Sequence, residues 1–486
     1  MMQQLKNFLK TPLQDENVLY QKISKEFCVH NNDFFAGDLL IAAYKKYPHH
    51  VALECQDSKI SYRELLFRAS LLSKTFIRYG ITKNDRIVVH LENSIEFYIA
   101  YFATWLCGSV AIPLNTFLHE KELAYIIDDA NPKLIFSTED NQTKLAELVN
   151  QALIQTLPTI LTKQEIDWQT PVPETIDCSF FQRLGYEEAC LFLYTSGTSG
   201  KPKGVMLSSR NIATNTIQAF ARFKKFGLGT DERFFCVLPL FHVFAQNTCI
   251  WLPTMTGGTV IIVPKIDRKL IFEGLTKKPT LFLGFPALYG LLCLMKTAPL
   301  DTIKFFISGA DMLPDKIRSA FAKIYGRKIC SGYGLTEASP VVAVNMDNNE
   351  CATNVVGDPL VGITCDIRDD QGHSLPALSI GTLWIKGDNV MMGYYNAPEM
   401  TSAVLQDGWL CTGDLASRDS HGIIAITGRS KDLIIHKGFN IYPQEVENVL
   451  LTHPAIFKAA VVGRDDATSG QVPVAFVAIK PGNDEA

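Results

Sequence analysis

The sequence lacks the cysteine patterns that form the disulfides of small secreted domains or that bind metal ions. Its twelve cysteines are scattered singly, without a Cys-x-x-Cys pair and without the cysteine–histidine spacing of zinc sites. This usage argues against a disulfide framework and is typical of a reducing compartment, so we expect a cytoplasmic protein. The chain also lacks an excess of positive charge, since its formal net charge is -4 at pH 7 and no local basic patch is visible. We therefore expect no nucleic-acid partner.

Secretory and membrane-spanning segments are missing as well. The N-terminus mixes lysine, glutamine and acidic side chains and has no apolar stretch of the signal-peptide type. Leu5, Phe8 and Leu9 form the apolar stripe of a short helix, which leaves two alternatives: docking onto its own domain, the commoner case, or peripheral contact with the inner membrane face. Two long uncharged spans, Phe97 to Leu118 and Phe234 to Pro264, are interrupted by glycine and proline, which favours buried core over membrane helices.

The most informative segment that is present runs from Tyr194 to Gly204. It holds three glycines, four serine or threonine hydroxyls and two lysines directly after an apolar run. Glycines let backbone N–H groups approach anionic oxygens, hydroxyls donate further hydrogen bonds, and lysines add compact positive charge. The segment is not a Walker A loop, because Pro202 follows Lys201 where that motif requires serine or threonine and then a helix. A plain surface hairpin would not explain the lysines on either side of a proline, so the pattern predicts a loop that binds a polyphosphate.

Length and periodicity predict an α/β protein of more than one domain. At 486 residues the chain is longer than one hydrophobic core usually serves. Helical patterns alternate with short β-branched runs along its first part, as in Tyr62 to Tyr79 followed by Arg86 to Leu91. This alternation predicts parallel sheets with crossover helices. From about Gly357 the pattern changes to short strands with turn signals, which predicts a β-rich subdomain.

A charged tetrapeptide, Arg429 to Asp432, separates two apolar strand-like runs and has the character of a hinge. One strand, a helix that begins at Pro443 and two more strands follow it. We therefore expect a large domain over residues 1–428, a hinge at 429–432 and a small α+β C-terminal domain at 433–486. Because so short a piece is close to the lower limit for an independent core, we expect that domain to be incomplete.

Five motifs occur in the order found in one known family. They are Tyr194 to Gly204, Phe241-His242, Tyr333 to Glu337, Thr412-Gly413-Asp414 and Gly428 to Glu447. Together they resemble the adenylate-forming superfamily, which comprises acyl- and aryl-CoA synthetases, the adenylation domains of peptide synthetases and firefly-type luciferases. The sequences of residues 238–244 and 438–447 look most like the corresponding segments of bacterial long-chain fatty acid-CoA ligases.

The resemblance implies a two-step ligase reaction that uses ATP, Mg²⁺ and coenzyme A. A fatty acid carboxylate attacks the α-phosphate of ATP to give an acyl-adenylate and pyrophosphate, and the thiol of coenzyme A then displaces AMP. Lysines, N–H groups and magnesium aimed at the phosphates reduce the repulsion between an anionic acid and a polyanion.

The resemblance also implies roles for the residues that match the family's motifs. It makes Thr195, Lys203, Thr336 and Glu337 the catalytic groups, with Thr195 and Glu337 at the magnesium ion. The Tyr333 ring is expected to stack on adenine, and Asp414 to accept hydrogen bonds from the ribose hydroxyls. The residues implied to bind ATP or AMP are Thr195, Ser196, Gly197, Thr198, Ser199, Gly200, Lys201, Gly309, Ala310, Asp311, Tyr333, Gly334, Thr336, Asp414 and Arg429.

For the acid, the resemblance places four residues at the acyl group: Phe241, His242, Gln246 and Phe285. His242 is expected to orient the carboxylate and not to transfer a proton. Some long-chain members of the family carry a tryptophan gate near the position of Gln246, so the preferred chain length stays open. Lys437 and Gly438 are implied to contact coenzyme A, and Lys431 to act at the hinge.

One element of the family pattern does not occur. The family has a catalytic lysine in a Pro-Lys-Thr-x-x-Gly-Lys pattern near the end of its small domain, and this sequence reaches Ala486 without it. We expect adenylation by this chain to be impaired while adenylate binding survives. Two other functions stay open, an acyl-AMP ligase that loads a carrier protein and a non-catalytic nucleotide- or acyl-adenylate-binding protein. The sequence also leaves open whether the protein is a monomer or a homodimer.

Overall fold

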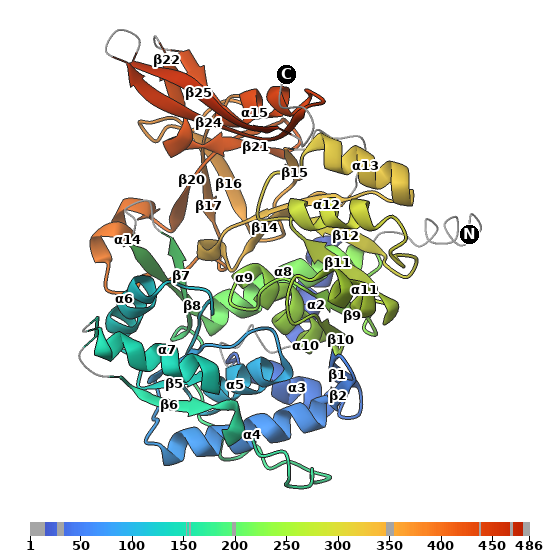
Figure 1. Ribbon diagram of the computed structural model, residues 1–486, viewed down its shortest axis with the longest axis vertical. Helices are drawn as coiled ribbons and strands as arrows, with labels where there is room; N and C mark the ends of the chain where they lie inside the picture. Colours follow the sequence, from blue (N-terminus) through green and yellow to red (C-terminus); the bar gives the residue numbers. More distant parts are fainter. Residues whose placement is uncertain are drawn as a thin grey trace.

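The computed structural model of the chain is shown in Figure 1. It describes residues 15–26, 34–151, 153–154, 157–196, 201–346, 354–436, 439–466 and 470–479. The described strands form four sheets. The C-terminal sheet lies at the top of the view, and the two largest sheets, with the helices that cover them, make up the middle and lower parts.

The largest sheet has eight strands in the order β14-β13-β12-β11-β9-β10-β1-β2. Its six inner strands run parallel to one another, and the two edge strands, β2 and β14, are antiparallel to their neighbours. In chain order the strands are β1 (Val51–Cys55), β2 (Ser58–Ser61), β9 (Arg233–Cys236), β10 (Thr259–Ile262), β11 (Leu281–Gly284), β12 (Phe305–Ser308), β13 (Cys330–Gly334) and β14 (Val341–Val344).

A seven-stranded sheet lies beside it, with the order β18-β8-β7-β4-β3-β5-β6. β7, β4, β3, β5 and β6 are parallel, whereas β8 pairs antiparallel with both β7 and β18. The strands are β3 (Arg86–Val89), β4 (Val110–Pro113), β5 (Leu134–Ser137), β6 (Thr159–Thr162), β7 (Ala189–Ser196), β8 (Pro202–Ser208) and β18 (Gly393–Tyr394). The predicted parallel sheets are therefore confirmed.

Helices connect and cover these strands, as the alternating pattern predicts. Two of them begin where a serine caps the first turn, because Ser61 Oγ accepts from the Glu64 N–H and Ser94 Oγ from the Phe97 N–H. The helices are α2 (Glu16–Glu26), α3 (Asp38–Lys46), α4 (Tyr62–Arg78), α5 (Ile95–Leu106), α6 (Glu120–Ala130), α7 (Glu139–Asn150), α8 (Ser209–Lys225), α9 (Val243–Gln246), α10 (Leu252–Thr256), α11 (Arg268–Thr276), α12 (Pro286–Met295), α13 (Asp315–Tyr325), α14 (Pro398–Val404) and α15 (Pro443–Leu451).

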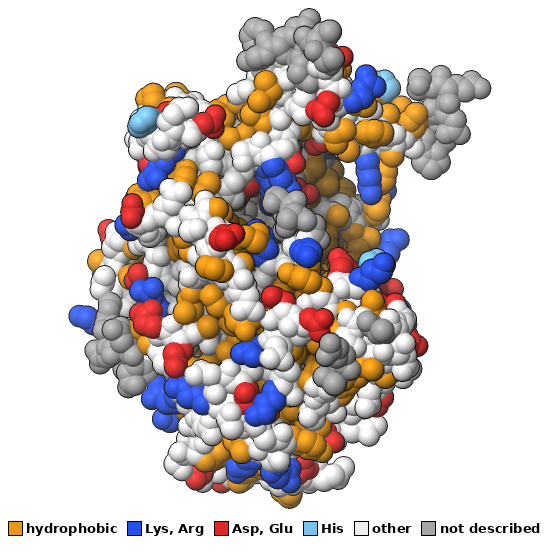
Figure 2. Space-filling model, turned by 90° about the vertical axis from the view of Figure 1, so that its left-hand side faces the viewer, with side chains coloured by type: hydrophobic (Ala, Val, Ile, Leu, Met, Phe, Trp, Pro, Cys, Tyr) orange, Lys and Arg blue, Asp and Glu red, His pale blue; other side chains and the backbone are white. Residues whose placement is uncertain are grey.

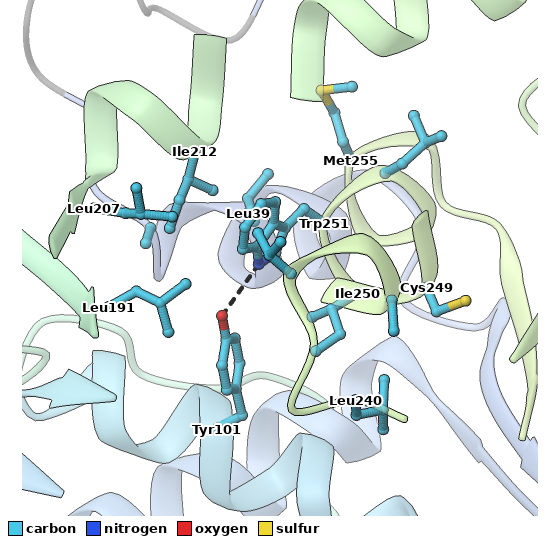
Figure 3. Packing of buried hydrophobic residues seen from close by; sticks show 14 of the residues in the cluster. Leu39, Tyr101, Leu191, Leu207, Ile212, Leu240, Cys249, Ile250, Trp251 and Met255 are labelled. Atoms are coloured by element: carbon cyan, nitrogen blue, oxygen red, sulfur yellow. Dashed lines mark hydrogen bonds between the residues drawn. The ribbon is translucent and has the colours of Figure 1, made fainter. Parts of the chain in front are cut away.

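The two uncharged spans of the sequence form the centre of the protein. All of α5 except Glu96 is buried, and the π-helical segment Asn247–Trp251 between α9 and α10 is buried as well. Two hydrogen bonds join them: the Tyr98 hydroxyl donates to the Cys249 carbonyl at 2.9 Å, and Trp251 Nε1 donates to the Tyr101 hydroxyl at 3.2 Å. The second lies among aliphatic side chains of the surrounding elements (Figure 3). The prediction of buried core is confirmed, and no helix in the described ranges has the length and apolar character needed to cross a membrane. The predicted N-terminal stripe of Leu5, Phe8 and Leu9 lies outside the described residues.

The predicted change to β structure is confirmed. An antiparallel sheet in the order β15-β21-β20-β17-β16, with β19 paired to β20, follows the parallel sheets. Its strands are β15 (Val355–Gly357), β16 (Thr364–Arg368), β17 (Gly381–Lys386), β19 (Leu405–Gln406), β20 (Trp409–Arg418) and β21 (Ile424–Arg429). The C-terminal sheet, in the order β23-β22-β25-β24, has the strands β22 (Ile434–His436), β23 (Phe439–Ile441), β24 (Ile456–Asp466) and β25 (Gly470–Ile479).

A buried arginine on α8 ties distant segments to the body of the protein. Arg222 Nε lies 2.7 Å from Glu16 on α2, and Nη2 lies 3.0 Å from Asp358, which follows β15. Nη1 donates to the Val344 carbonyl at 2.9 Å. Because a buried guanidinium is stable only when its donors are satisfied, these contacts hold the N-terminal helix and the start of the antiparallel sheet against α8.

A buried carboxylate on β1 joins three other elements. The Glu54 oxygens lie 2.7 Å from Arg233 on β9, 3.0 Å from Lys277 after α11 and 3.1 Å from Lys59 on β2. Burial acts to raise the pKa of Glu54, but the hydrogen bonds from the three cations outweigh it and lower the pKa to about 2.

We expect Glu54→Gln to change how stability depends on pH. A carboxyl pKa that is lower in the folded protein stabilises it above the unfolded value of 4.5, and this contribution is lost as the pH falls toward about 2. The variant should therefore melt at a lower temperature than the wild type at neutral pH, with a difference that shrinks between pH 4.5 and 2. Thermal melting across that range tests this, with Glu273→Gln as an exposed control. A difference in melting temperature that does not vary with pH would contradict it.

Candidate active site

A cavity of about 550 Å³ lies where the carboxyl ends of β12 and β13 meet the β7–β8 hairpin and the antiparallel sheet. Figure 2 shows the molecule hollowed beneath the lobe of C-terminal strands, with acidic and basic side chains beside one another around the hollow. Most of the residues predicted for phosphate, nucleotide and metal binding meet in this cavity. Those that line it are Thr195, Lys203, Ala310, Asp311, Tyr333, Gly334, Thr336, Glu337, Asp414, Arg429 and the predicted hinge residue Lys431.

The described ends of the predicted phosphate loop lie on β7 and β8, which pair as a hairpin. Thr195 pairs with Lys203 across the two strands, and both side chains line the cavity. Ser196 pairs with Pro202 through its backbone, while Lys201 is exposed, with its ammonium 5.8 Å from the Tyr125 ring centroid. Four residues predicted to bind phosphate lie outside the described residues: Gly197, Thr198, Ser199 and Gly200.

A part-buried hydrogen bond ties this hairpin to α6 near its turn end. The Tyr194 hydroxyl donates to Asp129 Oδ2 on α6 at 2.6 Å, and the ring passes so close to Gly204 that a β-carbon there would lie 3.1 Å from Tyr194 Cζ. Asp129 was not predicted, because nothing in the sequence around it distinguishes it from other acidic residues of a helix. The contact holds Lys203 at a defined place relative to α6.

The Thr336–Glu337 pair lies in a 3₁₀ turn (Thr336–Ala338) that follows β13. The chain turns tightly here, since a β-carbon on Gly334 would lie 2.2 Å from the Pro340 carbonyl oxygen, and only glycine fits. The Met391 N–H donates to the Glu337 carbonyl at 2.9 Å, and Asn389 Nδ2 donates to the Ala338 carbonyl at 2.8 Å. The backbone of this turn is therefore held by the segment that connects β17 to β18.

The side chains at this end of the cavity fit a magnesium ion. Glu337 supplies one carboxylate and Thr195 one hydroxyl, and across the described ranges no cluster of three or more acidic, histidine or cysteine side chains could hold a metal. Magnesium keeps several waters and is usually bound by one or two carboxylates together with substrate phosphates. The residues present thus suit an ion that arrives with a nucleotide.

Tyr394 was not predicted as a site residue, yet it contacts two residues that were, Lys203 and Glu337. The Tyr394 hydroxyl donates to Glu337 Oε1 at 2.8 Å and accepts from Lys203 Nζ at 3.4 Å, and Nζ lies 4.4 Å from the centroid of the Tyr394 ring. The sequence feature that could have pointed to Tyr394 is its position directly after Gly393, because a glycine next to an aromatic residue in a turn-rich segment can mark a site.

At the nucleotide end of the cavity, the predicted adenine and ribose residues touch each other. The Tyr333 hydroxyl donates to Asp414 Oδ2 at 2.5 Å, and Arg429 Nε lies 3.3 Å from Oδ1. Asp414 is 7% exposed, and burial raises the pKa of its carboxyl, against the hydrogen bond from Tyr333 and the charge of Arg429, which lower it. The carboxylate is thus held in a fixed position with little water around it.

The segment after β12 has a strained backbone at the cavity wall. Ala310 has a φ of 69°, which is unusual for a residue with a side chain, and the Asp311 carboxylate accepts from the Met312 N–H at 2.8 Å. Gly309 lies just behind this wall, where a β-carbon would be 3.3 Å from Cζ of Phe244. The absence of a side chain at Gly309 lets that ring pack directly behind the cavity.

The residues predicted for the acyl group lie at the carboxyl ends of β9 and β11, which are neighbouring strands. Phe241 and His242 precede α9 with their rings 4.5 Å apart, and Phe285 precedes α12. These three residues do not line the nucleotide cavity. Gln246 is fully buried and its Oε1 accepts from the Tyr101 hydroxyl at 2.8 Å, so its place at the acyl group stays a prediction. Lys437 and Gly438, predicted to contact coenzyme A, lie outside the described residues.

Comparison with known proteins identifies the family. Residues 41–395 match the family described as AMP-binding enzyme, and residues 445–486 match the AMP-binding enzyme C-terminal domain. The chain belongs to the adenylate-forming superfamily of AMP-binding enzymes. The predicted resemblance is therefore confirmed.

The relatives of this chain are ligases whose names specify different acids. It is 32% identical to the long-chain-fatty-acid–CoA ligase of Bacillus subtilis, over 91% of this chain and 85% of the relative, and 30% identical to the feruloyl-CoA synthase of Amycolatopsis sp, over 88% and 86%. The solved structure of ATP-bound MatB from Rhodopseudomonas palustris matches with a TM-score of 0.83 and 29% identity, covering 92% of this chain and 90% of that one. The o-succinylbenzoate coenzyme A synthetase (MenE) of Bacillus subtilis in complex with ATP and magnesium matches with a TM-score of 0.81 and 25% identity, covering 91% and 89%.

We expect Asp414→Asn to weaken nucleotide binding without destabilising the protein. An amide lacks the negative charge with which the carboxylate accepts hydrogen bonds from the ribose hydroxyls. The dissociation constant of AMP should therefore rise about tenfold or more. Burial raises the pKa of Asp414, so its buried charge costs folding free energy, and removing that charge should leave the melting temperature unchanged or higher. Calorimetric titration with AMP and thermal melting measure both quantities, with the exposed Asp370→Asn as control. A large fall in melting temperature with unchanged AMP affinity would contradict this role.

Proposed function

We propose that this chain is an AMP-forming acid–thiol ligase that activates a fatty acid as its acyl-adenylate and transfers the acyl group to coenzyme A. One observation carries the proposal: a single cavity is lined by a buried carboxylate suited to ribose, a lysine suited to phosphate and a carboxylate suited to magnesium, namely Asp414, Lys203 and Glu337. Membership of the AMP-binding family supports it.

The charges in the cavity suit the first step of this reaction. A carboxylate oxygen of the acid attacks the α-phosphorus of ATP, the bond to pyrophosphate breaks, and negative charge gathers on the leaving group. Lys203 points its ammonium into the cavity from β8, where it lowers the repulsion between the anionic acid and the phosphates and stabilises the leaving pyrophosphate. A bound magnesium ion supplies further positive charge at the phosphate oxygens. Asp414 and Arg429 hold the nucleoside end in place, which keeps the α-phosphorus in a defined position.

The second step transfers the acyl group. The sulfur of coenzyme A attacks the acyl carbon, the bond from that carbon to the AMP oxygen breaks, and the thiol proton leaves to solvent. Lys437 and Gly438, next to β22 and β23, are the residues we propose for the contact with coenzyme A.

Aromatic side chains support a fatty acid as the substrate. Phe241 and Phe285 follow the neighbouring strands β9 and β11, and the Phe244 ring on α9 packs next to Gly309 behind the nucleotide cavity, so apolar surface is available to shield an alkyl tail from water. The fatty-acid ligase relative from Bacillus subtilis agrees with this assignment, whereas the feruloyl relative makes an aromatic acid the second candidate.

The proposal is tested by measuring pyrophosphate release with a panel of saturated fatty acids, aromatic acids and short dicarboxylic acids, with and without coenzyme A. Thioester formation with fatty acids as the preferred substrates is the expected result. Adenylate that accumulates whether or not coenzyme A is present would instead favour a ligase that loads a carrier protein. ATP binding without pyrophosphate release from any acid would identify a nucleotide-binding protein without catalysis.

We expect Lys203→Ala to weaken the use of ATP more than the binding of the intermediate. The lysine faces phosphates that the acyl-adenylate no longer carries, so the KM for ATP should rise at least tenfold while a preformed acyl-adenylate binds within about threefold of its wild-type affinity. Pyrophosphate release and a binding titration measure the two effects. Lys269→Ala, whose side chain is 84% exposed on α11, is the matched control. Equal losses in both measurements would contradict the role.

We expect Phe244→Ala to widen the range of acids accepted. Its ring fills the space behind Gly309, so its removal opens room next to the wall of the nucleotide cavity. The ratio of kcat/KM for bulky acids to that for short ones should rise about tenfold, the size of effect that a change in an apolar pocket usually has. Competition assays with paired acids test this, with Phe272→Ala as a control because that ring is exposed on α11. An unchanged ratio would place the acyl group elsewhere.

A further inference from the structure

We propose that Tyr394 is a positioning residue that keeps Lys203 and Glu337 apart and aimed at the ligand, a role that rests on the proposed function. The phenol lies between the two charges: it donates to Glu337 Oε1 at 2.8 Å, and its oxygen lies 3.4 Å from Lys203 Nζ. Both charged residues line the nucleotide cavity together with Tyr394 itself.

Strand pairing and flanking backbone hydrogen bonds fix the backbone around Tyr394. β18 pairs with β8, the strand that carries Lys203, and opposes Tyr394 to Val205. On either side, the Met392 N–H donates to the Met206 carbonyl at 3.0 Å and the Tyr395 N–H donates to the Gly204 carbonyl at 2.7 Å. A side chain at Gly393, whose φ is 143°, would lie 2.8 Å from Thr401 Cγ2.

The same short segment also holds the other charged residue. The Met391 N–H donates to the Glu337 carbonyl at 2.9 Å, three residues before Tyr394 bonds the Glu337 carboxylate. Residues 391–395 therefore attach to the lysine strand on one side and to the Thr336–Glu337 turn on the other. Tyr394, which is 6% exposed, is the side chain that joins the two.

The chemistry of a phenol explains why this residue suits the position. Burial, followed by the nearby charge of Glu337, raises the pKa of Tyr394, so the hydroxyl keeps its proton and can donate it in a hydrogen bond to the carboxylate. Its oxygen and its ring face both attract the ammonium of Lys203, whose Nζ lies 4.4 Å from the ring centroid. Lys203 and Glu337, both described residues, form no ion pair with each other.

This arrangement has a functional consequence. A lysine and a glutamate in direct contact would neutralise each other, and a nucleotide would have to break that pair before it could bind. With the phenol between them, the ammonium stays available to phosphate oxygens and one carboxylate oxygen stays available to magnesium.

The experiment compares Tyr394→Phe with the wild type by titrating ATP calorimetrically at a series of fixed Mg²⁺ concentrations, alongside pyrophosphate-release kinetics. The variant keeps the ring and loses only the hydroxyl. We expect the Mg²⁺ concentration that half-maximally promotes ATP binding to rise about tenfold, and ATP affinity without Mg²⁺ to stay within about threefold, because the ring still attracts Lys203. A purely structural role would lower both affinities equally, together with the melting temperature.

Two matched variants sharpen the test. Tyr395→Phe changes the neighbouring tyrosine, whose ring packs 4.7 Å from that of Phe192, and should leave the Mg²⁺ dependence unchanged. In Glu337→Gln the carboxylate is already lost, so adding Tyr394→Phe should change the Mg²⁺ dependence by less than about twofold. Additive effects of the two substitutions would overturn the proposal, and so would a Mg²⁺ dependence of Tyr394→Phe equal to that of the wild type.

The outcomes separate this proposal from the proposed function. If no acid yields pyrophosphate but Mg²⁺-dependent ATP binding requires the Tyr394 hydroxyl, the ligase function fails and the positioning role stands. If the ligase is active and Tyr394→Phe behaves as the wild type, the positioning role fails alone. Wild-type protein that does not bind ATP in the presence of Mg²⁺ would overturn both.

Discussion

The nucleotide cavity depends on the hydrogen bonds made by residues 388–395, which join its two halves. Asn211 Nδ2 on α8 donates to the carbonyls of Asp388 and Val390, each at 2.8 Å, and so fixes the start of this segment to α8. Further along, the segment bonds to the Thr336–Glu337 turn and to β8. Without these bonds nothing in this segment would fix Lys203 and Glu337 relative to each other. Catalysis by preorganised charge requires that they do not move separately.

Burial and neighbouring positive charge act on two buried carboxylates, Glu54 and Asp414, and shift their pKa values in opposite directions. Glu54 is surrounded by three cations, and the pKa of its carboxyl falls to about 2, so its charge stabilises the fold. Asp414 has one arginine and a phenol beside it, and burial raises its pKa instead. A carboxylate that is underpaired inside a cavity retains capacity to accept hydrogen bonds from a ligand. The difference separates a carboxylate that supports the structure from one that is suited to binding.

Much of the fold could be predicted from local pattern, because its helices and strands alternate regularly along the chain. The helix expected over Tyr62 to Tyr79 ends at Arg78, and the strand expected over Arg86 to Leu91 ends at Val89. The motif residues were also found, since glycine, lysine and acidic side chains at fixed offsets are visible in a sequence. Tyr394 and Asp129 were not found, because each acts through a partner that lies far away along the chain: 57 residues separate Tyr394 from Glu337 and 65 separate Asp129 from Tyr194.

The sequence by itself determined the family, the parallel sheets and the identity of most of the charged side chains that line the cavity. These depend on the order of short motifs and on hydrophobic periodicity, both of which are local. Only the tertiary structure decided which of those groups touch. Tyr333, expected to stack on a base, hydrogen-bonds the expected ribose residue Asp414, and Gln246, expected near the acyl group, is buried against Tyr101. The physical reason is that hydrogen-bond partners, burial and pKa are set by neighbours that packing brings from distant parts of the chain.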